Sequence, residues 1–171
     1  MADADIPLSP GATSSGVHGE FHIDIRWRDL TEIANTLFSE ADYVTASTVY
    51  ETAFDEARML LAEAWNGTGQ YAEHIAPMLV VSAGNMARNA QALSQDAFAF
   101  ASLASTIDLF VEVLDSASAP ISLKAECVKH LPRLVSDFKN AVVGTDDFKD
   151  REKQYISRAH TSVLNYWKIQ K

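Results

Sequence analysis

Histidine and cysteine are the side chains of this sequence best suited to acid–base, nucleophilic or metal chemistry. His18 and His22 flank Glu20, so three metal-binding groups lie within five residues near the start of the chain. A structural zinc site uses four protein ligands, and no further one follows close by. We therefore expect an empty or adventitious site there, and no bound metal. The remaining residues of these types are His74, His130, His160 and the single cysteine, Cys127.

The sequence contains no recognisable catalytic motif. A serine nucleophile elbow, a phosphate-binding glycine loop and a zincin motif are all missing from it. Glu73 and His74 are expected at the start of a helix, where the glutamate suits the helix dipole and the histidine is solvated. Cys127 falls near an apolar stripe, where a lone cysteine usually acts as a small apolar side chain. We predict no enzyme activity and no cofactor. The alternative is a small helical-bundle enzyme or ligand binder with a site near His74 or His130.

Composition favours one soluble domain. The chain has 171 residues, of which 47% are hydrophobic and 22% charged, values that are ordinary for a globular protein. One cysteine excludes an intramolecular disulfide and is typical of the reducing cytoplasm. No run of about 20 apolar residues stands out as a membrane span, and the first residues do not read as a secretory signal. We expect a cytoplasmic protein with no membrane partner.

Charge is distributed unevenly along the chain. Residues 1–118 contain four basic and seventeen acidic residues, whereas residues 119–171 contain ten basic and six acidic ones. An acidic body argues against nucleic acid as a partner, because phosphates require clustered Lys and Arg. It could instead attract a basic segment of a partner, or the basic end of the chain itself. That end carries Lys149, Arg151, Lys153, Arg158 and Lys168.

Two apolar ladders with helical spacing occupy residues 30–57. Side chains three and four apart lie on one face of a helix, and a short break at Asp42-Tyr43 separates the two ladders. This pattern predicts an antiparallel hairpin of two helices. The first ladder is Leu30, Ile33, Ala34, Leu37, Phe38 and Ala41, and the second is Ala46, Val49, Tyr50, Ala53, Phe54 and Ala57.

Residues 1–20 are predicted to form a flexible tail, and residues 21–171 a single all-α domain. Phe21, Ile23, Ile25 and Trp27 alternate with polar residues, a period of two that is typical of a strand. A lone strand has no neighbour in a helical protein, so we expect an extended arm that packs on the first hairpin. The helix should begin between Asp24 and Arg28. Exchange of this arm between two copies would give a homodimer, and a structural dimerisation subunit is a further alternative.

Four more helices complete the predicted fold. The third starts within residues 73–76 and ends near Leu93, and the fourth follows with Ser94 as its N-cap. The fifth runs from Pro120 to Val143, with Pro132 expected to kink or split it, and the sixth ends near Ile169. We expect the fourth helix to be the most buried. The stripes assigned to the core are Phe98, Ala101, Leu103, Ile107, Phe110, Val111 and Leu114; then Ala125, Val128, Leu131, Val135, Phe138 and Val142; then Phe148, Tyr155, Ile156, Ala159, Val163 and Trp167.

The first hairpin resembles a tetratricopeptide repeat, a helix-turn-helix unit of about 34 residues. Ala41-Asp42-Tyr43 stands where that family commonly has a Gly-Asp-Tyr turn, and Ala46, Tyr50 and Ala53 fall on its Ala, aromatic and Ala positions. Residues 30–57 give one good repeat and the rest of the chain departs from the period. The prediction is therefore three antiparallel hairpins in a tetratricopeptide-like array or a helical bundle.

The resemblance implies a groove that binds a peptide or a partner helix, as in an adaptor or a chaperone-like protein. The groove-facing positions that it implies on the first hairpin are Arg28, Thr31, Asn35 and Phe38. Some members of the family bind a terminal carboxylate through Lys and Asn, and here Thr31 replaces the lysine. On the third helix Asn85 and Asn89 are four apart with Arg88 beside them, and their amides suit either a peptide backbone or a neighbouring helix.

Overall fold

The computed structural model describes residues 25–67, 71–142 and 148–169, and within these ranges all regular structure is α-helical. This confirms the predicted all-α fold with six helices. The predicted tail and arm fall largely in residues 1–24, outside the described residues, so the dimer formed by arm exchange stays a prediction. The helices are α1 (Ile25–Ser39), α2 (Tyr43–Asn66), α3 (Ala72–Ala92), α4 (Asp96–Asp115), α5 (Ile121–Val142) and α6 (Lys149–Ile169).

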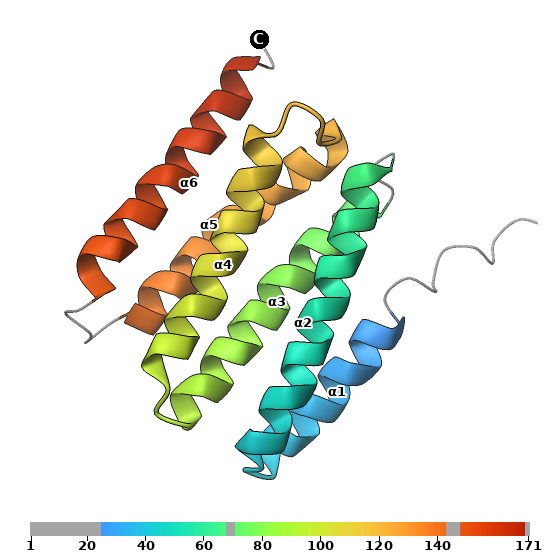
Figure 1. Cartoon of the computed structure of the whole chain (residues 1–171), viewed down its shortest axis with the longest axis vertical. Helices are drawn as coiled ribbons and strands as arrows, with labels where there is room; N and C mark the ends of the chain where they lie inside the picture. Colours follow the sequence, from blue (N-terminus) through green and yellow to red (C-terminus); the bar gives the residue numbers. More distant parts are fainter. Residues whose placement is uncertain (1–24, 68–70, 143–147, 170–171) are drawn as a thin grey trace, which may run out of the picture.

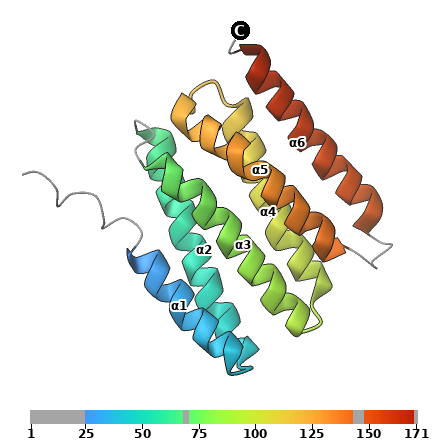
Figure 2. The same cartoon turned by 180° about the vertical axis from the view of Figure 1, so that it is seen from behind.

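Consecutive helices run antiparallel and form an array with α1 at one edge and α6 at the other (Figure 1). Seen from behind, α1, α3 and α5 face the viewer, with α2 and α4 behind them (Figure 2). α3 packs against α2 and α4, α5 packs against α3 and α4, and α6 packs against α4 and α5. One face of the molecule is therefore built from the first helix of each hairpin.

The three residues between α1 and α2 end the first helix and cap the second. Ala41 adopts a left-handed conformation with φ of 62°. Its N–H donates to the carbonyl of Phe38 at 3.1 Å, and the Asp42 N–H donates to the carbonyl of Leu37 at 3.0 Å. This pair of bonds is the Schellman motif that satisfies the last carbonyls of a helix. The Asp42 carboxylate then accepts from the Thr45 N–H at 3.2 Å and caps α2.

Ala41→Gly should raise the free energy of unfolding by up to about 1 kcal/mol, because glycine adopts a positive φ without the steric cost that alanine meets. The Ala41 side chain is exposed, so its loss removes no packing. Ala62→Gly, at an exposed position inside α2, is the matched control and should lower the free energy by about 0.5–1 kcal/mol. Urea unfolding followed by circular dichroism measures both. Losses of equal size in the two variants would contradict the assigned turn.

The turn between α3 and α4 also forms a Schellman motif, and this corrects the expectation that Ser94 is the N-cap of α4. Ser94 has φ of 58°, its N–H donates to Gln91, and the next N–H, of Gln95, donates to the carbonyl of Ala90 at 2.8 Å. Ser94 therefore terminates α3, and it is not the N-cap of α4. Gln95 occupies that N-cap position and makes no side-chain capping bond.

Burial in the structure confirms the second ladder of the first hairpin. In the first ladder and in the α4 stripe, some residues predicted to be buried are exposed. Five of the six α2 ladder residues are buried, whereas Ile33 of the first ladder is 53% exposed. In α4 Ala101 is exposed and Phe98 is 37% exposed. α3 is the most buried helix, with 13 of its 21 residues buried against 11 of 20 in α4. The expectation for α4 was wrong because α3 contacts four helices, α1, α2, α4 and α5, whereas α4 contacts three, α3, α5 and α6.

The predicted stripes of α5 and α6 are confirmed in part. Leu131, Val135 and Phe138 of α5 and Ala159 of α6 are buried, and the other described members pack against the core except for Ala125 and Trp167. The fully buried residues of α5 include Leu123, Cys127 and Leu134, which the predicted stripe omitted, and Ala125 is exposed. In α6 Tyr166 is buried and Trp167 is 53% exposed. α5 is one continuous helix through Pro132, so the proline does not split it.

α4 also corrects the expectation about membrane spans. Among the described residues it is a helix long and apolar enough to cross a bilayer, with a mean hydropathy of 1.7 over its best window. In this structure 61% of that window is buried inside the protein. Packing against α3, α5 and α6 accounts for its composition.

Candidate functional site

The predicted binding residues on α1 are largely engaged within the protein. Thr31 is buried and its hydroxyl donates to the carbonyl of Trp27 at 2.8 Å. The Asn35 side-chain carbonyl accepts from the Tyr50 hydroxyl at 2.8 Å, which ties α1 to α2. Phe38 is half-buried, with its ring edge-on to Tyr43 at 5.2 Å between centroids. Arg28 is exposed but is not free of interactions. The Thr31 hydroxyl is therefore engaged with its own helix, and its part in binding stays a prediction.

The three predicted α3 residues have different surroundings: Asn89 is buried and bonded inside the protein, whereas Asn85 and Arg88 line a cavity. Asn89 is 1% exposed, and its amide nitrogen donates to the carbonyl of Tyr43 at 2.9 Å. The Asn89 amide is thus engaged with a neighbouring helix, which is the other use that the sequence allowed for it. Asn85 and Arg88 instead line a cavity between α3 and α5.

This cavity has a volume of about 260 Å³, and six of the twelve residues that line it are polar. It is lined by α3 and α5, two helices of the face that Figure 2 presents, and by Leu103 of α4. α3 contributes both amide and guanidinium groups, and α5 adds a guanidinium, a carboxylate and an amide. The polar residues around it are Asn85, Arg88, Gln91, Arg133, Asp137 and Asn140.

Gly84 leaves the space for this cavity. It lies inside α3 and lines the cavity, and a methyl group added at its Cα would lie 3.9 Å from the Asp137 carboxylate. Glycine within a helix lowers stability by roughly 0.5–1 kcal/mol relative to alanine. An alanine would fit here without a clash, so close packing does not require the glycine. The glycine leaves the cavity wider than an alanine at this position would.

The two arginines of the cavity differ in their pairing. Arg133 Nε lies 3.8 Å from the Asp137 carboxylate one helical turn along α5. Arg88 is exposed and forms no hydrogen bond or ion pair with any residue in the described ranges. Burial raises the pKa of the Tyr50 hydroxyl, and the positive charge of Arg88 acts against this rise. Arg88 therefore places a positive charge at the edge of the cavity, near enough to Tyr50 to affect its pKa.

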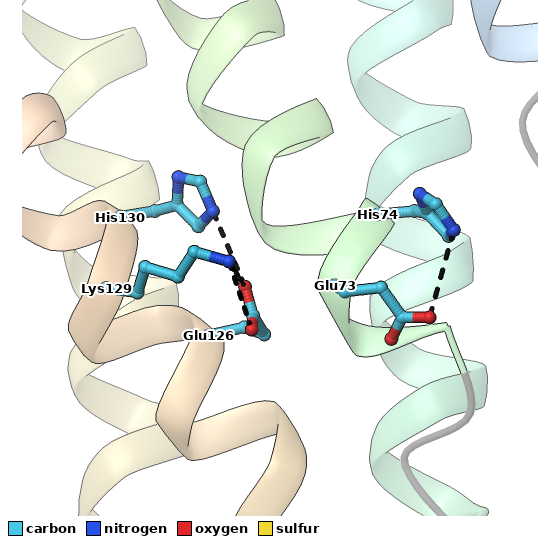
Figure 3. A network of polar contacts seen from close by, with 5 residues as sticks. All are labelled: Glu73, His74, Glu126, Lys129 and His130. Atoms are coloured by element: carbon cyan, nitrogen blue, oxygen red, sulfur yellow. Dashed lines mark hydrogen bonds and ion pairs between the residues drawn. The ribbon is translucent and has the colours of Figure 1, made fainter.

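The histidines considered for catalysis form two small polar groups (Figure 3). Lys129 and His130 both contact the Glu126 carboxylate, at 3.0 Å and 3.5 Å, and His74 lies 3.8 Å from its neighbour Glu73. Burial lowers the pKa of His130, which Glu126 partly opposes. A histidine held by a carboxylate could act as a general base, but these contacts bring no nucleophile to it. No group of three metal-binding side chains occurs among the described residues.

Cys127 is next to Glu126 in the chain, yet its thiol is turned into the core. It is fully buried, and burial raises its pKa to about 12, with a further contribution from the Glu126 charge. A thiolate is the reactive form of cysteine, so this thiol is inert at neutral pH. It acts as the small apolar side chain that the sequence indicated.

Most of the cavity was missed by sequence reasoning. The pattern on α3 pointed to Asn85 and Arg88, but nothing in it indicated that α5 would supply Arg133, Asp137 and Asn140. α3 and α5 are separated by a whole helix in the chain and become neighbours only through packing. The available signal was Gly84, an isolated glycine inside a strong helical pattern.

Comparison with known proteins gives one result. The family described as "Protein of unknown function (DUF2753)" matches residues 25–140. The match covers more than half of the chain and includes all six polar residues of the cavity, whereas α6 lies outside it. No curated protein and no solved structure matches the chain. The chain belongs to the DUF2753 family.

Proposed function

We propose that this protein is an interaction module, an adaptor or a chaperone-like binder, that holds a peptide segment or partner helix on the face of α1, α3 and α5. The observation that carries the proposal is the polar cavity between α3 and α5 with the unpaired guanidinium of Arg88 beside it. In this proposal the cavity takes one side chain or the end of the bound segment. The rest of the segment lies along the helices.

The size and chemistry of the cavity support a peptide over a cofactor. Pockets for small organic ligands usually measure about 300–1,000 Å³ and are mainly apolar. This cavity, at about 260 Å³, is smaller, and half of the residues that line it are polar. Asn85, Gln91 and Asn140 offer amide donors and acceptors, which match the N–H and C=O groups of a peptide. Arg88 adds a charge for a carboxylate of the ligand.

The resemblance of residues 30–57 to a tetratricopeptide repeat supports the same proposal, because that family binds peptides on the face made by the first helix of each hairpin. The proposal includes a cytoplasmic location, in keeping with a single cysteine whose thiol is buried. Nucleic acid is not the partner proposed here, since residues 25–115 contain thirteen acidic and only four basic residues.

Filling the cavity should abolish binding without unfolding the protein. Peptides would be selected from a displayed random library against the wild-type protein, and their affinities measured by fluorescence anisotropy. Gly84→Leu places an aliphatic side chain in the cavity and should weaken binding at least about tenfold, while its helix propensity keeps α3 stable. Arg88→Gln removes one charge-assisted hydrogen bond and should weaken binding about tenfold to a hundredfold.

Arg58→Gln is the matched control, because Arg58 is an exposed arginine on α2 that does not line the cavity. It should bind the selected peptides as the wild type does. Unfolding curves of all variants show that the fold is retained. The proposal is wrong if the library gives no binder, or if the selected peptides bind Gly84→Leu and Arg88→Gln as tightly as the wild type.

A further inference from the structure

The last helix, α6, buries small side chains and exposes large apolar ones. Its buried residues are Ala159, Ser162 and Tyr166. Three large apolar residues of its last two turns are 61%, 53% and 78% exposed, in the order Leu164, Trp167 and Ile169. Burial of apolar area holds a helix to its neighbours. The second half of α6 (residues 159–169) is therefore held weakly.

Low burial alone does not set α6 apart, because α1 at the opposite edge of the array also buries few residues (Figure 1). The two helices differ in the polar contacts that join them to the array. The Trp27 indole N–H of α1 donates to the Ser82 hydroxyl of α3 at 2.8 Å in a partly buried position. α6 is joined to α4 by Arg158 and Asp108 at 2.7 Å, and both of these side chains are roughly half exposed. An ion pair in contact with water adds little stability.

Open space lies on both sides of α6. A groove of about 590 Å³ separates it from α4, and another of about 580 Å³ separates it from α5. Ser162 lines the first groove and Ala159 lines the second. Closely docked helices interdigitate and leave little space between them. The second half of α6 therefore rests on its neighbours along a narrow strip of small side chains.

The first half of α6 is anchored by aromatic contacts. The Tyr155 ring lies edge-on to Phe100 and Phe138, at 5.9 Å and 5.6 Å between centroids, and the Arg151 guanidinium lies over the Phe100 ring at 5.0 Å. These contacts can hold the first half in place when the second half opens. We propose that the second half of α6 detaches reversibly from α4 and α5 while the rest of the fold stays intact.

This opening uncovers apolar surface that the closed form hides. Val111 of α4 and Leu131 of α5 lie beside α6 and are buried in the closed form. Both belong to residues 25–140, the part of the chain that matches the family, whereas α6 lies outside that match. α6 thus acts as a lid on the part that the family shares, and it does so at a distance from the cavity between α3 and α5.

The test compares two buried serines that are each replaced by cysteine. Ser162→Cys places a thiol on α6 and Ser102→Cys places one on α4, where the serines are 3% and 5% exposed. Each full-length variant is treated with a thiol reagent under native conditions, and mass spectrometry of the digested protein gives the labelling rate of each thiol. The α6 thiol should react at least about tenfold faster than the α4 thiol, because local opening requires less free energy than global unfolding. Cys127 is fully buried and reports global unfolding in both variants.

Two further substitutions, each combined with Ser162→Cys, test what holds the lid closed. Asp108→Asn removes the partner of Arg158 and should speed labelling of the α6 thiol about twofold to fivefold, the effect of one exposed ion pair. Asp55→Asn is the matched control, because it removes an exposed ion pair with Arg58 inside α2, and it should leave the rate unchanged.

The ratio of the two labelling rates within one molecule decides the outcome. A variant that is destabilised as a whole labels Cys127 faster as well, so the ratio still separates local opening from unfolding. The proposal is overturned if the α6 thiol of Ser162→Cys reacts as slowly as Cys127, or no faster than the α4 thiol of Ser102→Cys. Hydrogen exchange of the unaltered chain gives an independent check: amides of residues 159–169 should exchange faster than those in the middle of α1, and equal protection would also overturn the proposal.

Discussion

Phe138→Ala should lower the free energy of unfolding by about 3–5 kcal/mol, the range for truncating a fully buried aromatic side chain. The Phe138 ring is fully buried, 5.0 Å from the ring of Phe100 on α4 and 5.6 Å from that of Tyr155 on α6. It therefore joins three helices. Phe100 is also held by stacking on Phe148 at 4.6 Å, so the neighbours cannot collapse into the space that the missing ring leaves.

Urea unfolding followed by circular dichroism measures the loss, which should appear as a lower midpoint with an unchanged slope. Phe98→Ala is the matched control, because Phe98 lies on α4 and is 37% exposed. Its loss should be clearly smaller than that of Phe138→Ala. Similar losses in the two variants would show that the aromatic cluster does not hold α5 and α6 to the array.

Asn89→Asp should be the most damaging polar substitution, with a loss of about 3–5 kcal/mol at neutral pH, the range for a buried charge without a partner. The Asn89 amide nitrogen donates to the carbonyl of Tyr43 at 2.9 Å, and a carboxylate would set a negative oxygen against that carbonyl. The Asn89 side-chain oxygen has no hydrogen-bond partner among the described residues, so no donor is positioned to stabilise the new charge.

The loss should shrink as the pH falls. Burial raises the pKa of the new carboxyl in the folded state above the unfolded value of about 3.9. The unfolded state then releases its proton more readily, and stability falls as the pH rises from about 3.9 through the folded pKa. Below that window the protonated carboxyl can again donate to the Tyr43 carbonyl. Unfolding curves of Asn89→Asp and the wild type, compared across this pH range, measure the difference.

Asn35→Asp is the matched control because it adds the same charge at an exposed position. The Asn35 side-chain oxygen accepts from the Tyr50 hydroxyl, and a carboxylate there still accepts. The change in stability should be small at all pH values. A loss in Asn35→Asp as large as that in Asn89→Asp would mean that burial is not the cause.

Local sequence signals gave the helices and several of their ends. The ladder of Ala46, Tyr50 and Phe54 is buried as its period requires, and Asp42 caps α2 where the break between the ladders placed it. α6 extends to Ile169, the last residue that the structure describes. These features depend on spacing and on residues one to four positions apart, which a sequence displays directly. Ser94 shows the limit, because serine suits an N-cap but here ends the preceding helix in a left-handed conformation.

The rotation of each helix about its axis was harder to predict from the sequence. α5 has apolar residues on two sides, and periodicity alone does not say which side meets the core. The structure buries Cys127 and Leu134 fully and Val135 almost fully, and leaves Val128 half-buried beside α6. In α6 the adjacent pair Tyr166 and Trp167 offered the same ambiguity, and Tyr166 is the buried one.

The sequence by itself determined an acidic, all-α chain of helical hairpins, because composition and local periodicity are properties of neighbouring residues. Only the tertiary structure decided which polar side chains come together. It buried Asn89 against Tyr43 and joined Arg88 of α3 to the α5 side chains Arg133 and Asn140 around one cavity. Those partners are more than 40 residues apart in the chain. Their meeting depends on how whole helices pack, and short-range spacing carries no record of it.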